Sequence, residues 1–182
     1  MMEHRLKEFL RKTYWLIIVA AIIVAIDQYT KWLVIKNIPY GGFWSPWDWL
    51  TPFARIVHWS NTGVAFGMLQ GMNPVFILLA FVVSGMIIYY YQKLEPVDKL
   101  LKLALMLELG GAVGNLVDRI KYGHVIDFVS VGNFPVWNVA DGCITVGVVI
   151  LLIGVWIQEK REKARQAAAK QKNSIDGTIV EQ

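Results

Sequence analysis

The chain has 182 residues, 55% of them hydrophobic, and a formal net charge of +4. Its mean hydropathy of +0.44 indicates an integral membrane protein and excludes an ordinary soluble domain. The positive charge does not indicate a nucleic-acid-binding protein, because Lys and Arg gather in the first dozen residues, in residues 93–102 and in residues 160–172, as they do beside the cytoplasmic ends of membrane helices.

The first long apolar run covers residues 14–35 and follows a basic start. A secretory signal peptide begins in the same way, but no small-x-small cleavage site follows here and the apolar pattern continues past Asp27. We therefore expect a retained membrane helix of about 22 residues. Asp27 and Lys31 share one face of it. They form either an ion pair near the outer interface, with Lys31 reaching the lipid headgroups, or part of a functional site.

Residues 37–72 contain too many prolines and glycines for a membrane helix and are rich in tryptophan. Segments such as residues 54–59 can form short strands. We expect a small extramembrane β element that rests on the membrane interface through its tryptophans. It contains the heptad NTGVAFG at residues 61–67, whose small and polar residues ordinary loop chemistry would also explain.

Three further apolar runs predict membrane helices at residues 74–91, 100–118 and 138–157, and a basic tail follows at residues 159–182. The basic flanks place both termini in the cytoplasm and the stretch 119–136 on the outer face. The predicted fold class is an all-α membrane protein with four transmembrane helices, a small β element and a short interfacial loop or helix. Residues 1–158 would form one membrane-embedded domain.

The stretch 110–141 carries three aspartates, Asp118, Asp127 and Asp141, between two apolar helices. Ionisable groups near bilayer depth are costly unless they are paired or functional, so this stretch is the candidate site. Two carboxylates in a poorly solvated pocket share a proton. The ionised one can take a proton from water while the protonated one polarises a carbonyl, which is peptide hydrolysis without a metal or a covalent intermediate.

Which two aspartates would pair remains open from these residues. Asn138 can cap the fourth helix and place Asp141 in its first turn, although Asp141 could simply complement the helix dipole. Asp127 is the lone charge of an apolar run, or else an exposed loop residue. Asp118 could form a local salt bridge with the adjacent Arg119 or order the loop.

Glu108, within the third predicted helix, could be protonated, paired with an arginine such as Arg119, or turned toward a cavity. Other chemistries have weaker support. The three histidines lie far apart, and no HExxH or Cys/His spacing predicts a metal site. Cys143 is the only cysteine and has apolar neighbours, so we expect a buried, inert thiol. No GxSxG setting supports a serine nucleophile, and we expect no cofactor.

With these residues in view, the chain resembles the lipoprotein signal peptidases (signal peptidase II) over residues 14–156. The resemblance rests on five motifs in the family's order: residues 27–31 (DQYTK), 61–67 (NTGVAFG), 110–119 (GGAVGNLVDR), 125–128 (VIDF) and 138–141 (NVAD). It implies a membrane aspartyl endopeptidase of the bacterial cytoplasmic (inner) membrane, with an extracytoplasmic β-cradle, here residues 37–72, over its site. The implied substrate is a diacylglyceryl-modified prolipoprotein, cut just before the lipidated lipobox cysteine.

The resemblance also implies residue roles. Asp127 and Asp141 match the catalytic dyad. Positions that match substrate-binding or supporting residues of the family are Asn61, Gly63, Asn115, Arg119, Asn138 and Ala140. Asp27, Lys31 and Asp118 match positions that support the site's structure. The implied partners are membrane lipid and globomycin-type inhibitors, with no nucleic acid, no metal and a monomeric enzyme.

Two other classes of protein remain as rivals. One is a small proton-coupled transporter or channel with an aspartate relay, but the chain shows no inverted repeat and its carboxylates cluster at one face. The other is a non-enzymatic lipoprotein-binding scaffold, which would keep its function after dyad substitutions.

Overall fold

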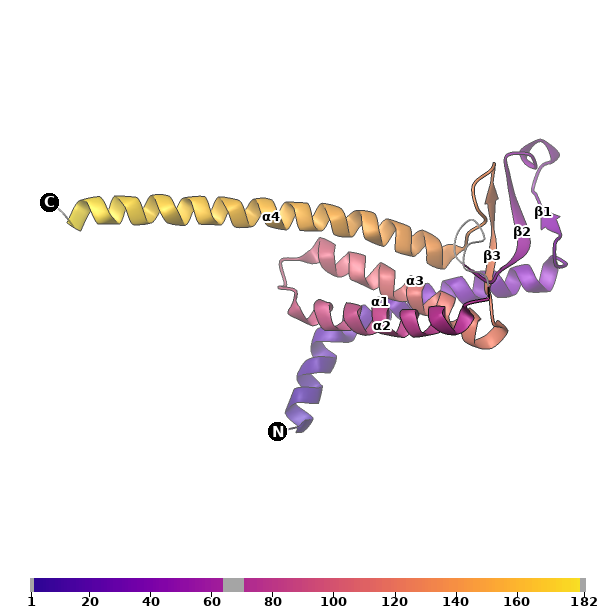
Figure 1. The fold of residues 1–182 in the computed structure, drawn as a ribbon, viewed down its shortest axis with the longest axis horizontal. Helices are drawn as coiled ribbons and strands as arrows, with labels where there is room; N and C mark the ends of the chain where they lie inside the picture. Colours follow the sequence, from indigo (N-terminus) through magenta and orange to yellow (C-terminus); the bar gives the residue numbers. More distant parts are fainter. Residues whose placement is uncertain (1, 64–70, 181–182) are drawn as a thin grey trace.

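The computed structural model describes the backbone of residues 2–63 and 71–180, and the side chains of residues 9, 11–63 and 71–166. Four long helices form a bundle with a small sheet at one end (Figure 1). The helices are α1 (Met2–Asn37), α2 (Asn73–Lys93), α3 (Lys99–Tyr122) and α4 (Val139–Val180). The strands are β1 (Phe43–Trp44), β2 (Ala54–Asn61) and β3 (Val125–Val131), with a 3-10 turn, η1 (Asp48–Leu50), between the first two.

Each long helix contains a segment long and apolar enough to cross a membrane: Arg11–Asn37, Asn73–Lys93, Lys99–Tyr122 and Val139–Gln166. The predicted class, a four-helix membrane protein with a small β element, is therefore confirmed. Large apolar side chains on the outer faces of these helices are exposed, as expected of surfaces that face lipid. Both ends of the chain and the α2–α3 turn lie at the end of the bundle away from the sheet (Figure 1).

All four helices extend past their predicted C-terminal ends, and the extensions of α3 and α4 are the longest. The third helix was expected to stop at residue 118, but α3 continues to Tyr122, so Arg119 lies on the helix. Gly123 then ends α3 in the left-handed region, at φ +79°, and its N–H donates to the Arg119 carbonyl at 3.2 Å. The fourth membrane helix was predicted at residues 138–157, followed by a tail that is helical at first and then disordered. Instead, α4 continues as one helix to Val180, because Ala, Lys, Glu and Gln favour helix.

The sheet has the order β1–β2–β3 and both pairings are antiparallel. The described part of residues 37–72, predicted as the β-cradle, supplies two of the three strands, β1 and β2, and β3 comes from the connection between α3 and α4. The sequence of β3, VIDFVSV, is rich in β-branched residues, which favour strands. In the register, Trp59 of β2 lies opposite Asp127 of β3. The sheet thus fixes a candidate catalytic residue to the β-cradle.

Helix α3 is the centre of the bundle and packs against the other three helices. Three glycines allow this close approach. A Cβ at Gly110 would lie 2.7 Å from Ile23 of α1, and one at Gly111 would lie 2.5 Å from the Ala140 carbonyl oxygen of α4. A Cβ at Gly114 would lie 2.8 Å from Asp27 of α1 and 3.3 Å from Ala140 of α4. Polar side chains of α1 and α4 therefore reach α3 near its C-terminal end.

Candidate active site

A buried ion-pair cluster joins α1 to α3. The Lys31 ammonium lies 2.8 Å from Asp27 Oδ2 and 2.7 Å from Asp118 Oδ2, and all three side chains are at most 1% exposed. Lys31 also donates to Asn115 Oδ1 at 3.0 Å. The predicted Asp27–Lys31 ion pair is confirmed. The idea that Lys31 reaches the headgroups is wrong, because two carboxylates and an amide oxygen hold its ammonium inside the bundle.

The same cluster fixes the backbone on either side of the site. Asp118 Oδ2 accepts the Ile126 N–H at 3.1 Å, which attaches α3 to β3. Asp27 Oδ1 accepts the Ala140 N–H at 3.0 Å, which attaches α1 to the start of α4. Gln28 Nε2 donates to Asp118 Oδ1 at 2.8 Å. Gln28 was not among the predicted site residues, although it follows Asp27 directly in the first family motif.

Asp127 lies on β3 and is only 1% exposed, so the interpretation as an exposed loop aspartate is wrong. Two amide groups hold its carboxylate. Asn138 Nδ2 donates to Oδ1 at 2.7 Å, and Asn61 Nδ2 donates to Oδ2 at 2.9 Å. Asn61 is itself oriented, because its Oδ1 accepts the Gly63 N–H at 3.0 Å.

Asp141 lies in the first turn of α4, where a reciprocal cap places it. The Asp141 N–H donates to Asn138 Oδ1 at 3.0 Å, and the Asn138 N–H donates to Asp141 Oδ2 at 3.2 Å. The predicted cap at Asn138 is thus confirmed. The other carboxylate oxygen, Oδ1, accepts Asn115 Nδ2 at 2.8 Å.

Asn138 connects the two carboxylates. Its side chain is fully buried and donates to Asp127, while its backbone N–H donates to Asp141. The side-chain amide also lies 3.2 Å from Asn115 Oδ1, which accepts Lys31. A continuous hydrogen-bond network therefore runs from the buried ion pairs to both aspartates, and each of their four carboxylate oxygens accepts a hydrogen bond from a described residue.

The surroundings of Asp127 favour its protonated form. Burial in the protein is the main cause and the negative charge of Asp141 is the second; together they raise the pKa of Asp127 to about 7. The hydrogen bonds from Asn61 and Asn138 and the charge of Lys31 act in the opposite direction. Asp127 can therefore hold or release a proton near neutral pH.

Arg119 lies beside this network but bonds to neither aspartate among the described contacts. Its guanidinium donates to the Gly63 carbonyl at 2.9 Å and lies 4.4 Å from the centre of the Phe76 ring. The suggested salt bridge with Asp118 is wrong, since Asp118 pairs with Lys31. The pairing suggested between Arg119 and Glu108 is not among the described contacts either. Residues 64–67 of the family heptad lie outside the described residues.

Two further predictions concern metals and thiols. Within the described part of the chain, no group of three His, Cys, Asp or Glu side chains is placed to hold a metal ion. Cys143, which we expected to be buried, is only partly buried on α4. Glu108 Oε1 is buried and has no hydrogen-bond partner among the described residues.

Comparison with known proteins gives a consistent result. Residues 19–157 match the family model for signal peptidase (SPase) II. The chain is 42% identical over 147 residues to a lipoprotein signal peptidase of Shouchella clausii (strain KSM-K16), covering 80% of this chain and 95% of the relative. It is 37% identical over 159 residues to that of Anoxybacillus flavithermus (strain DSM 21510 / WK1), covering 84% and 91%.

The fold also matches a solved structure, described as a bacterial membrane enzyme structure by the in meso method at 2.3 Å resolution. The TM-score is 0.74 at 27% identity, and the match covers 80% of this chain and 90% of the other. Together with the family match over most of the chain, these findings confirm the resemblance inferred from the five motifs. The chain belongs to the signal peptidase II family.

Proposed function

We propose that this chain is an aspartyl endopeptidase that removes the signal peptide from diacylglyceryl-modified prolipoproteins, cutting just before the lipidated lipobox cysteine. Its relatives are named lipoprotein signal peptidases. The observation that carries the proposed chemistry is the position of Asn138, which donates hydrogen bonds to both Asp127 and Asp141. Two carboxylates supported by one residue can act on one water molecule.

The reaction is a hydrolysis in which the dyad carries one proton. The ionised carboxylate removes a proton from the water as its oxygen attacks the scissile carbonyl carbon, and the protonated carboxyl donates to the carbonyl oxygen. When the tetrahedral intermediate collapses, the C–N bond breaks and a proton passes to the leaving amine. Because the charges interact, the dyad titrates as a pair. Asn61, Asn115 and Asn138 would hold both carboxylates in place while substrate binds, and we expect them and Arg119 to steer the peptide.

The lipid part of the substrate would enter laterally between helices, since its acyl chains have no reason to leave the bilayer. A cavity of about 580 Å³ supports this route. It lies between the end of α1 and the sheet, and its lining includes Val34, Ile38, Ile56 and Phe128. Phe128 follows Asp127 on β3. An apolar group of the substrate could rest there while the scissile bond reaches the dyad.

The charge distribution supports an active site near the extracytoplasmic face of the bacterial inner membrane. The aspartates lie toward the sheet, whereas the basic ends of the chain and the α2–α3 turn lie at the other end of the bundle (Figure 1). We expect the enzyme to act as a monomer within membrane lipid and to bind globomycin-type inhibitors at the dyad.

The direct test is a gel-shift assay with purified enzyme in detergent and a diacylated prolipoprotein. The wild type should cleave it, while Asp127→Asn and Asp141→Asn should not. Asp48→Asn is the matched control, because Asp48 is an exposed carboxylate on η1. This variant should cleave the substrate as the wild type does.

Cleavage that survives both dyad substitutions would move the chemistry elsewhere, with Asp118 the next residue to test. If the wild type cleaved no diacylated substrate, the proposed peptidase activity would be wrong, and a transporter or scaffold would explain the fold better.

A further inference from the structure

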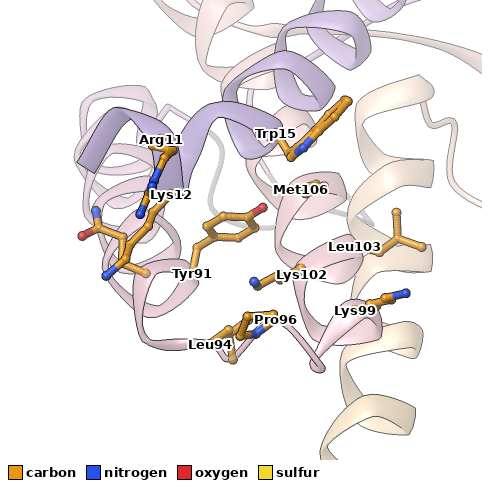
Figure 2. A pocket seen from close by; sticks show the side chains of 11 residues that line it. Arg11, Lys12, Trp15, Tyr91, Leu94, Pro96, Lys99, Lys102, Leu103 and Met106 are labelled. Carbon is orange, nitrogen blue, oxygen red and sulfur yellow. The ribbon is translucent and has the colours of Figure 1, made fainter. Parts of the chain in front are cut away.

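Another cavity, lined by basic and apolar side chains, lies at the end of the bundle away from the dyad. It has a volume of about 560 Å³ and lies between the start of α1, the end of α2, the α2–α3 turn and the start of α3 (Figure 2). The peptidase chemistry uses none of its residues. Figure 2 shows Arg11, Lys12 and Lys102 arranged around the ring of Tyr91, which is only 4% exposed.

The described charged side chains that line this cavity all have one sign. Four of its lining residues are basic, Arg11, Lys12, Lys99 and Lys102, and none of the described lining residues is acidic. The two acidic residues beside the lining in sequence, Glu95 and Asp98, do not line the cavity, and the Asp98 carboxylate accepts the Glu95 N–H at 3.0 Å. Such a concentration of positive charge at a membrane interface attracts an anionic group.

The start of α3 adds to this attraction. The helix begins at Lys99, and Lys99 and Lys102 near its start both line the cavity. Lys102 lies one turn further along, 5.8 Å from the centre of the Tyr91 ring. The cavity therefore combines the cations of α1 with those at the start of α3, a combination that suits phosphate oxygens.

The rest of the lining is apolar and continues onto the surface that faces lipid. Trp15 is 61% exposed and Leu103 is 41% exposed, and Met106 lies one turn further into the bilayer. Tryptophan at this depth is typical of the membrane interface. A ligand that fills both parts of the cavity must carry an anion at one end and hydrocarbon at the other.

We propose that this cavity binds an anionic phospholipid of the adjoining leaflet. Its phosphate lies among Arg11, Lys12 and Lys102, and an acyl chain runs along Trp15 and Leu103. Because these residues come from α1 and α3 and enclose the end of α2, one bound lipid would hold three helices together at the end of the bundle where no sheet joins them.

The test is native mass spectrometry of the full-length protein released from detergent, titrated with phosphatidylglycerol or with zwitterionic phosphatidylcholine. The wild type should retain one phosphatidylglycerol in preference to phosphatidylcholine. The double variant Arg11→Gln/Lys102→Gln should bind phosphatidylglycerol about thirtyfold more weakly, as expected for the loss of two interfacial cations. Its affinity for phosphatidylcholine should change little.

The matched control is Lys160→Gln/Arg165→Gln, which removes the same charge from the exposed basic part of α4, outside the cavity. It should keep the preference for phosphatidylglycerol, as should the charge-preserving variant Arg11→Lys/Lys102→Arg. Retained cleavage in detergent would show that the variants fold. If the double glutamine variant failed to fold, the single variant Arg11→Gln would be titrated, since Arg11 is exposed.

Equal weakening in the cavity variant and the α4 control would overturn the proposal, because net charge alone would then explain binding. An unchanged preference in the cavity variant would also overturn it. Titration with inorganic phosphate and glycerol phosphate distinguishes a lipid from a soluble anion. If either displaced the bound phosphatidylglycerol at millimolar concentration, the site would accept a free phosphate and the assignment to a lipid would be wrong.

Discussion

Because Asp127 is buried, Asp127→Asn should become more stable relative to the wild type as the pH rises. Its surroundings raise its pKa from the ordinary value of 3.8 to about 7. The folded protein therefore binds the proton more tightly than the unfolded chain does. The favourable contribution of the protonated form is complete below pH 4 and is lost as the pH rises toward 7.

The size of the effect follows from the shift. With a difference of about 3 pKa units, the wild type loses about 4 kcal/mol of its free energy of unfolding at pH 8, relative to low pH. At pH 5 it loses only about 1.5 kcal/mol. Asp127→Asn does not titrate, so it loses none of this free energy at either pH. It also replaces a carboxylate that accepts from Asn61 and Asn138 by an amide with one acceptor oxygen, which costs about 1–3 kcal/mol at any pH.

The cost of the lost acceptor cancels when two pH values are compared. Between pH 5 and pH 8, the stability of Asp127→Asn relative to the wild type should rise by about 2.5 kcal/mol. Since 1 kcal/mol corresponds to about 2–4 °C in Tm for a chain of this size, the relative Tm should rise by about 5–10 °C. Thermal unfolding in detergent, followed by tryptophan fluorescence, measures this shift.

Asp48→Asn is the control, because its carboxylate is exposed and its relative Tm should stay constant between the two pH values. A constant difference between Asp127→Asn and the wild type would refute the reasoning, since it would mean that ionising Asp127 costs the folded protein nothing. A shift of the opposite sign would show that the carboxylate is stabilised as an anion.

Three further predictions follow from the same contacts. Gly114→Ala should lower the free energy of unfolding by about 1–3 kcal/mol, since its methyl would lie 2.8 Å from Asp27 Oδ2 of α1. The control Gly85→Ala, where a methyl would meet nothing within 4 Å, should leave the Tm unchanged or slightly raised. Lys31→Met should lower stability by about 3–5 kcal/mol, because it leaves two buried carboxylates without their cation, and the exposed Lys36→Met should have little effect in the same unfolding assay. In a pH series of the cleavage assay, kcat/KM should fall above about pH 7 as the proton on Asp127 is lost, and a flat profile up to pH 9 would contradict the shared-proton mechanism.

The features that the sequence predicts well depend on short stretches of chain. Hydropathy over about 20 residues predicts the four spans, because each helix satisfies its own backbone within one segment. The cap between Asn138 and Asp141 was predicted for a similar reason, since both partners lie within three residues.

The features that the sequence analysis missed depend on contacts between distant segments. Strand β3 pairs with β2, and the Asn61–Asp127 hydrogen bond joins residues 66 positions apart. Lys31 was given a place at the headgroups because its second carboxylate, Asp118, belongs to another helix. The spacing of Asp27 and Lys31 indicates only that they share a face of their own helix. It could not show that α3 supplies a second carboxylate to the Lys31 ammonium.

Arg119 shows the same limit at a helix end. The sequence placed it in the loop after the third helix and beside Asp118, and two salt-bridge partners were considered on that basis. The structure extends α3 past it and turns its guanidinium toward the Gly63 carbonyl. Even the first residue beyond a predicted helix end points in a different direction when the helix continues, because each further helical residue rotates the side chain by about 100°.

The central claim is that Asp127 and Asp141 act as one catalytic unit. The most direct measurement is the single-turnover rate constant for cleavage of a diacylated prolipoprotein by excess enzyme, for Asp127→Asn, Asp141→Asn and the double variant. Groups that act as a unit are strongly non-additive, so each single variant should lose about 10²–10⁴-fold or more and the double variant should be no slower than either single variant. Losses that multiply in the double variant, or one single variant that keeps the wild-type rate, would contradict the dyad.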